Sequence, residues 1–188
     1  STLYQKLQSA AGWDKNGDIT LDGGKYRKIE RKGYNKSTIH YYKYQPIKWR
    51  VLSVDSSKAF LLADRILDDM PYHTVKEDIT WEESTVRSWL NGYDASANKQ
   101  KQDYSGQNFI QSAFDTSGQS AILVTDVENQ DNLSFGTEGG ADTKDKVFLL
   151  SESEVYTDAA KGYGFSPEAN LNDEARRAKK ADTLAEYV

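Results

Sequence analysis

Three oxygen-bearing side chains alternate in the segment DKNGD, residues 14–18. Asp14, Asn16 and Asp18 occupy the spacing of the first, third and fifth positions of a calcium-binding loop, where alternate side chains converge on one cation. The sixth position, normally Gly, is Ile19, and the twelfth, normally a bidentate acid, is Lys25. We therefore expect no metal and no cofactor. Calcium at these three residues is the alternative to an Asp-Asn-Gly turn that leads into a strand.

A second acidic segment, residues 126–145, is rich in Gly, Asn and Thr. Its acids are Asp126, Glu128, Asp131, Glu138, Asp142 and Asp145. In calcium-dependent lectins such a loop holds both the ion and sugar hydroxyls, but the spacing here matches no fixed ligand signature. We favour a structural role, in which Thr143 and Asp145 cap and tie the loop down through side-chain-to-backbone hydrogen bonds.

The residue types of nucleophilic catalysis do not form a recognisable set. His40 and His73 lie far apart in the sequence, and no Gly-x-Ser-x-Gly elbow accompanies them. The chain has no cysteine and shows neither a phosphate-binding loop nor a dinucleotide fingerprint. We assign no catalytic residue. A glycosidase-type pair of carboxylates stays open, because 29 acidic residues always offer pairs.

Aromatic residues in polar segments are the best candidates for ligand binding. The chain has 12 Tyr, 4 Trp and 6 Phe. Tyr and Trp combine a flat apolar face with a polar rim, which suits both sugar stacking and protein interfaces. The predicted ligand-binding residues are Trp81, Tyr93, Tyr104 and Tyr163. Trp49 and Trp89 lie on apolar faces, and we expect them in the core.

Basic residues gather between positions 25 and 36. They are Lys25, Arg27, Lys28, Arg31, Lys32 and Lys36, opposed only by Glu30. Such a stretch could bind a polyanion, but we favour a solvated hairpin whose charges protect the sheet edge.

Composition narrows the class of protein. With 188 residues, a net charge of −5 and a mean hydropathy of −0.77, the chain is expected to form a single domain, 1–188. No apolar run approaches the ~18 residues of a membrane span. The acidic pI of 5.1 argues against nucleic acid as a partner. The only methionine is Met70, and we expect both ends to be cuts in a longer polypeptide.

Periodicity and turn residues predict an α+β fold with a mostly antiparallel twisted sheet, short helices and long loops. Strands are expected at 25–30, 38–44, 121–127 and 146–150, and a hairpin at 47–54 and 58–63, whose FLLA run indicates a central strand. Helices are expected at 1–11, at 83–90 with Ser84 as its cap, at 108–114 and from 153, and an amphipathic stretch at 172–181. The predicted core is Trp49, Val51, Leu61, Leu62, Trp89, Phe109, Leu123, Val147 and Leu149.

Three segments together resemble one family. They are PIKWRVLSVDSSKAFLLADRILDDMPYH at 46–73, TVRSWLNG at 85–92 and DTKDKVFLLSESEV at 142–155. In this order they resemble the DUF6273 family, a domain of unknown function in secreted and wall-attached proteins of Firmicutes. VFLLSESEV is also similar to the strand-then-helix step of formylglycine-generating and related C-type-lectin-like domains. The resemblance implies a C-type-lectin-like fold, although zero cysteines disfavour the cysteine-dependent oxidase activity of the former.

The resemblance also implies a cellular location and a function. We expect a secreted or cell-surface protein of a Gram-positive bacterium that binds a carbohydrate, wall polymer or protein without catalysis. A hydrolase-type enzyme and a structural spacer are the alternatives. The family usually continues into further strands, so we also expect association through an open sheet edge or a retained C-terminal fragment.

Overall fold

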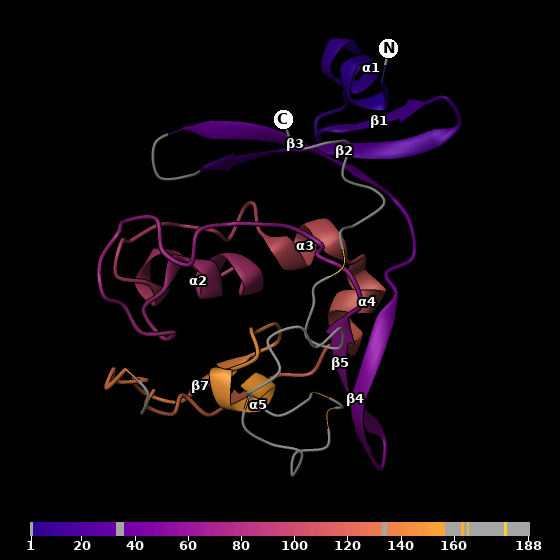
Figure 1. Cartoon of the computed structure of the whole chain (residues 1–188). Helices are drawn as coiled ribbons and strands as arrows, with labels where there is room; N and C mark the ends of the chain where they lie inside the picture. Colours follow the sequence, from indigo (N-terminus) through magenta and orange to yellow (C-terminus); the bar gives the residue numbers. More distant parts are fainter. Residues whose placement is uncertain are drawn as a thin grey trace. The chain divides into compact units, whose positions relative to one another are not determined.

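The computed structural model describes residues 2–32, 36–132, 135–156, 163, 165 and 179. The chain divides into two compact units, which are residues 1–70 with 159–188 (unit 1) and residues 71–158 (unit 2). Its antiparallel sheets and short helices confirm the predicted α+β class (Figure 1). Within the described residues, no helix combines the length and apolar character needed to cross a membrane.

Unit 1 begins with a helix and a three-stranded antiparallel sheet. The elements are α1 (Leu3–Ser9), β1 (Asp18–Leu21), β2 (Gly24–Lys32) and β3 (Ser37–Lys43), in sheet order β1-β2-β3. Thr2 and Gln5 form a capping box that starts α1. Leu7 of α1, which is completely buried, packs with Tyr26 and Tyr41 on one sheet face. The predicted helix and both predicted strands are confirmed, and the opposite sheet face carries the buried Ile29 together with polar side chains.

A hairpin completes the described strands of unit 1. It consists of β4 (Trp49–Asp55) and β5 (Lys58–Ala63), as predicted, with a register shift between Val51 and Ser53. Among the described residues β5, which contains the FLLA run predicted as a central strand, pairs with β4 alone. The side chains of a strand point off the two sheet faces and are buried only by a layer packed there, and Leu61 remains 41% exposed.

The predicted core is therefore only partly correct. Trp89 and Phe109 are buried, as expected, at 4% and 8% exposure. Five members are exposed, contrary to the prediction, and these are Trp49, Val51, Leu61, Leu123 and Leu149. The first three lie in the two-stranded hairpin, and the other two lie outside regular elements. Apolar pattern alone placed them inside, whereas burial depends on a covering layer.

Unit 2 consists of short helices with one small sheet. Its elements are α2 (Thr85–Asn91), the 3₁₀ turn η1 (Ala95–Ala97), α3 (Phe109–Ala113), α4 (Thr116–Ala121), β6 (Thr125–Val127), β7 (Thr143–Asp145) and α5 (Glu152–Tyr156). Ser84 and Asn108 cap α2 and α3 by accepting backbone N–H bonds, which confirms both predicted helices. The rings of Trp89 and Phe109 pack with centroids 5.5 Å apart and join α2 to α3.

Two predicted strands of unit 2 are displaced. The strand predicted at 121–127 starts only at Thr125, because Ala121 still belongs to α4. The strand predicted at 146–150 is wrong, since β7 ends at Asp145. The backbone N–H groups of Lys146 and Val147 donate to Asn91 Oδ1 at 2.9 and 3.0 Å, so a side chain replaces the strand partner. The helix predicted from 153 is α5, and the stretch 172–181 lies outside the described residues apart from Lys179.

Candidate functional site

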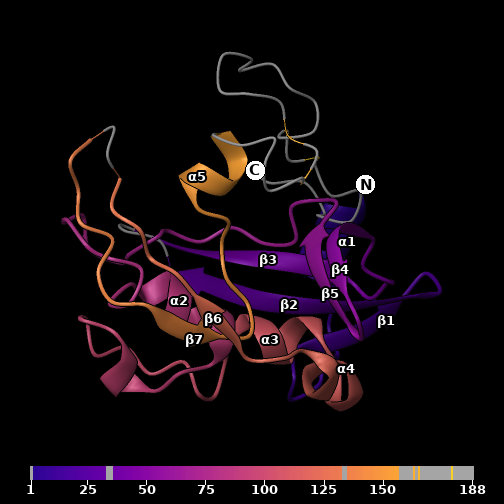
Figure 2. The ribbon, with the colours of Figure 1, turned by 90° about the horizontal axis from the view of Figure 1, so that it is seen from below.

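A buried carboxylate organises unit 2. Asp145 is the last residue of β7, which runs beside α2 (Figure 2), and it has no exposed surface. Helix α2 begins after its Ser84 cap and ends at Gly92, whose left-handed φ of +72° turns the chain toward Tyr93. A Cβ at Gly92 would lie 2.7 Å from Asn108 Nδ2, so the turn requires glycine. These local signals place the side chains of α2 against β7.

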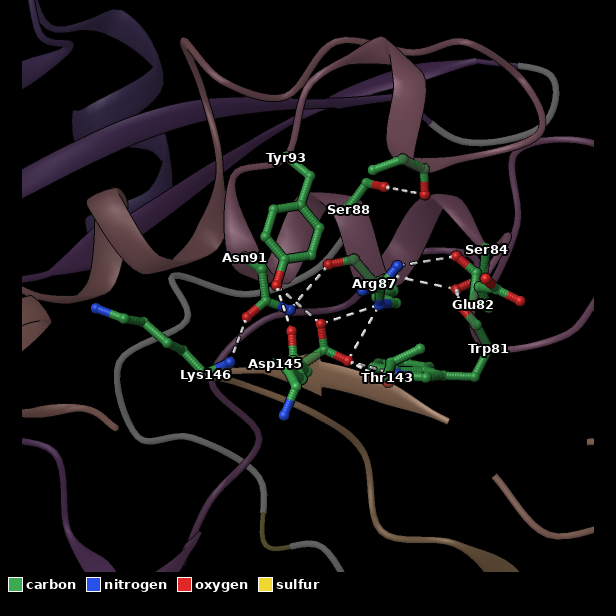
Figure 3. Close-up of polar contacts among 12 residues, drawn as sticks. Trp81, Glu82, Ser84, Arg87, Ser88, Asn91, Tyr93, Thr143, Asp145 and Lys146 are labelled. Carbon is green, nitrogen blue, oxygen red and sulfur yellow. Dashed lines mark hydrogen bonds and ion pairs between the residues drawn. The ribbon is translucent and has the colours of Figure 1, made fainter. Parts of the chain in front are cut away.

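Four side chains donate hydrogen bonds to Asp145 (Figure 3). Arg87 Nε lies 2.9 and 3.0 Å from the two carboxylate oxygens. Trp81 Nε1 and Thr143 Oγ1 donate to Oδ2 at 3.0 and 2.6 Å, and Tyr93 Oη donates to Oδ1 at 2.9 Å. One buried anion on β7 thus binds Tyr93, Arg87 and Trp81, which lie 52, 58 and 64 positions away in the chain. We call Asp145 with these four donors the Asp145 network.

The network shifts the pKa values of its members in opposite directions. Burial is the largest influence on the pKa of Asp145 and would raise it, but the hydrogen bonds from Arg87, Thr143 and Trp81 outweigh it and lower the pKa. Burial, together with the hydrogen bond to Asp145, raises the pKa of Tyr93 to about 12. At neutral pH the carboxyl is therefore an anion and Tyr93 is a neutral donor.

Asn91 of α2 also binds the chain next to Asp145, through the backbone of Lys146 and Val147. Its Nδ2 donates to the carbonyl of Val147 at 2.8 Å while its Oδ1 accepts the two N–H groups that follow β7. Arg87 and Asn91 are four residues apart and so share one helix face. The sequence analysis missed both residues. Their signal was a polar stripe on a helix whose other side chains, including Val86, Trp89 and Leu90, are buried.

Three of the four predicted ligand-binding aromatics are connected in unit 2. Trp81 and Tyr93 both donate to Asp145, and the Tyr104 N–H donates to the Tyr93 carbonyl at 3.0 Å. Trp81 is buried, whereas Tyr93 and Tyr104 are partly exposed. Tyr163 belongs to unit 1, where its ring packs edge-on against Phe60 at 5.5 Å. The predicted set thus divides between the two units.

The segment 14–18 forms a hydrogen-bonded turn. Asp14 Oδ1 accepts the N–H groups of Asn16 and Asp18, both at 2.8 Å. Asp18 is paired with Arg27 Nε at 2.6 Å and Lys25 Nζ at 3.2 Å. A calcium ion at these residues would compete with two cationic partners and two backbone donors.

The acidic loop also uses its carboxylates to hold backbone. Asp142 Oδ1 accepts the Asn129 N–H, and Asp131 Oδ1 accepts the Gly139 N–H, both at 2.9 Å. Thr143 donates to Asp145 as described above. The loop's side-chain-to-backbone bonds thus come from Asp142 and Asp131, whereas Thr143 and Asp145, for which such bonds were predicted, bond side chain to side chain.

The two histidines have separate settings, one in each unit. His73 of unit 2 is 2% exposed; its Nδ1 accepts the Thr85 N–H at 3.2 Å and its Nε2 lies 3.2 Å from Glu77 Oε1. Nδ1 therefore ties the segment before α2 to the helix, whereas Nε2 contacts Glu77 within that segment. His40 of unit 1 contacts Thr38 and Tyr42 on β3.

These features define an α+β protein with small antiparallel sheets and short capped helices, in which the buried carboxylate of Asp145 joins β7 to α2. A family model described as "Domain of unknown function (DUF6273)" matches residues 56–188. The match spans more than half of the chain, and the chain belongs to this family. It includes β5 and all of unit 2, hence the whole Asp145 network. Searches of curated proteins and of solved structures found no match.

Proposed function

We propose that this chain is a non-catalytic binding module of an exported bacterial surface protein and that it recognises carbohydrate through the aromatic side chains around Asp145. The observation that supports this most directly is the way Tyr93 is held. Its hydroxyl donates to Asp145 and also lies 2.9 Å from the Lys144 carbonyl, and the Arg87 guanidinium lies 5.0 Å from its ring centre. The ring is partly exposed, its hydroxyl is held, and one of its faces contacts Arg87.

A fixed aromatic ring suits binding because less side-chain freedom is lost when a ligand stacks on it. Neighbouring rings extend the surface. Tyr72, which is 41% exposed, packs against Trp81 with centroids 6.3 Å apart. Trp81 and Tyr93 are both anchored on Asp145, so Trp81 links Tyr72 to the carboxylate that holds Tyr93. A C-type-lectin-like arrangement of this face is part of the proposal.

Charge favours a neutral sugar over an anionic wall polymer. Residues 71–158 contain 16 Asp and Glu against six Lys and Arg. A surface of this sign repels polyanions and would attract a basic protein segment. A neutral glycan is recognised by stacking and hydroxyl bonding, and neither needs opposite charge.

A glycan array probed with the full chain tests the proposal. We expect a set of neutral glycans to be retained, and Tyr93→Ala and Tyr72→Ala to weaken retention at least tenfold while far-UV circular dichroism stays unchanged. Phe135→Ala is the matched control, since Phe135 is 78% exposed and is absent from the aromatic contacts of this cluster. Failure to retain any glycan would refute the carbohydrate proposal and favour a structural spacer. Loss of binding in Phe135→Ala alone would move the binding face to the 126–145 loop.

A further inference from the structure

Polar side chains gather on the sheet face of unit 1 opposite α1. Thr38, His40 and Tyr42 alternate along β3 and therefore point to the same face. Arg31 of β2 is the cross-strand partner of Thr38 and lies on this face as well. Asp68, from the segment after β5, meets them there, with Arg31 Nε 2.9 Å from its Oδ2 and Tyr42 donating to its Oδ1.

The ligand-type atoms of this group are closely spaced. His40 Nδ1 lies 3.7 Å from Asp68 Oδ1 and 3.6 Å from Asp69 Oδ1, and the three donor atoms lie within 4.8 Å of one another. Ligands about 2.0–2.1 Å from a tetrahedral zinc ion are separated by about 3.3–3.5 Å. The two nitrogen–oxygen distances are longer than a hydrogen bond but close to the separation of two ligands of one ion.

We propose that His40, Asp68 and Asp69 bind a divalent transition-metal ion of the zinc class through His40 Nδ1 and one oxygen of each carboxylate. One imidazole and two carboxylates are ligands that zinc accepts, and three protein ligands leave a coordination position for water or a substrate atom. The site lies in unit 1 and is independent of the carbohydrate proposal for unit 2.

The groups behind these ligands orient them for metal. Thr38 Oγ1 lies 2.9 Å from His40 Nε2, and Tyr42 Oη lies 3.1 Å from Nδ1. In the tautomer with a proton on Nε2, the Nδ1 lone pair can bind a metal in place of Tyr42. Arg31 holds Oδ2 of Asp68, and the Asp69 N–H donates to its Oδ1 at 2.9 Å. Thr38 and Arg31 thus hold the second polar atoms of His40 and Asp68, as is characteristic of metal sites, whereas the Asp69 N–H bonds the proposed ligand oxygen of Asp68 itself.

Charge and access are also compatible with a cation. Arg31 balances Asp68, while Asp69 contributes a further negative charge within 3.6 Å of the imidazole. The side chains of His40 and Asp68 are buried, at 8% and 5% exposure, whereas Asp69 is 63% exposed. Asp69 therefore provides the open side through which an ion enters. Binding would replace the hydrogen bonds of the Tyr42 hydroxyl to Asp68 Oδ1 and to His40 Nδ1 and leave the hydroxyl beside the ion.

Zinc titration of the chelator-treated full chain by calorimetry tests the site. We expect one saturable zinc per chain. Asp69→Asn should weaken it at least tenfold without unfolding the protein, because Asp69 is mostly exposed. Thr38→Val, which removes only the partner of His40 Nε2, should weaken binding about tenfold. The control Asp22→Asn removes an acid of the same unit that pairs with Lys6, and it should bind zinc like the parent chain.

Cobalt substitution supplies a second readout. The intense visible absorption of four-coordinate Co²⁺ should appear in the parent chain and be lost in His40→Gln, whose folding is checked by circular dichroism. The proposal is overturned if no one-to-one binding is seen, if Asp69→Asn binds zinc as tightly as the parent, or if Asp22→Asn weakens binding equally. In that event the hydrogen bonds among Tyr42, His40 and Asp68 close the cluster without metal.

Discussion

Replacing Asp145 by Asn should remove much of the stability of unit 2. The carboxylate is completely buried and accepts bonds from four side chains, including the Arg87 guanidinium, whose side chain is only 13% exposed. The amide has one acceptor oxygen, so its NH₂ group would face donors on the other side. Arg87 would also lose its counter-ion. Removing one partner of a buried ion pair costs about 3–5 kcal/mol.

This loss is large relative to the total stability of a domain, which is about 5–15 kcal/mol. With a urea m value of about 2 kcal/mol per molar, the unfolding midpoint should fall by about 2 M. Far-UV circular dichroism is the suitable probe, because Trp81 donates to Asp145 and its fluorescence would change before unfolding.

Asp126→Asn is the matched control. Asp126 lies on β6, opposite β7, and forms an exposed ion pair with Lys144. The urea midpoint of Asp126→Asn should therefore equal that of the parent chain within experimental error. Equal midpoints for Asp145→Asn and the parent chain would show that the Asp145 network does not stabilise the fold. A comparable loss in Asp126→Asn would show that strand charge in general, rather than the buried carboxylate, is responsible.

Three further outcomes are expected. The folded-state pKa of Asp145 lies below its unfolded value, so the stabilisation by its carboxylate is present above about pH 4 and is lost as the pH falls through the folded pKa. The difference in unfolding free energy between the parent chain and Asp145→Asn should therefore narrow in acid. A difference that stays constant with pH would refute this. Trp89→Ala should cost about 3–5 kcal/mol, because the indole is 4% exposed against Phe109, and an unchanged melting temperature would contradict that packing. Calorimetry with calcium should detect no site at or below ~0.1 mM that depends on Asp14, since the turn carboxylates already hold backbone N–H groups and cations; a site lost in Asp14→Ala would overturn this.

Local elements could be predicted because their signals lie within a few residues. Ser84 and Gly92 mark the two ends of α2, and Asn108 marks the start of α3, through hydrogen bonds and φ values that neighbouring residues set. The hairpin of β4 and β5 likewise follows from its turn chemistry. For the candidate site, the sequence indicated Trp81, Tyr93 and the structural role of Asp145.

Only the tertiary structure decided which groups meet. Arg87 and Asp145 are 58 positions apart, and nothing local to either residue indicates the other. The Asn91 side chain accepts the backbone N–H groups of Lys146 and Val147 in place of a neighbouring strand, so this apolar run does not form a strand. In the same way Val51 remains 56% exposed although its alternation is typical of a core strand. Burial and ion pairing depend on elements brought together from distant parts of the chain, whereas caps and turns depend on the chain's immediate neighbours.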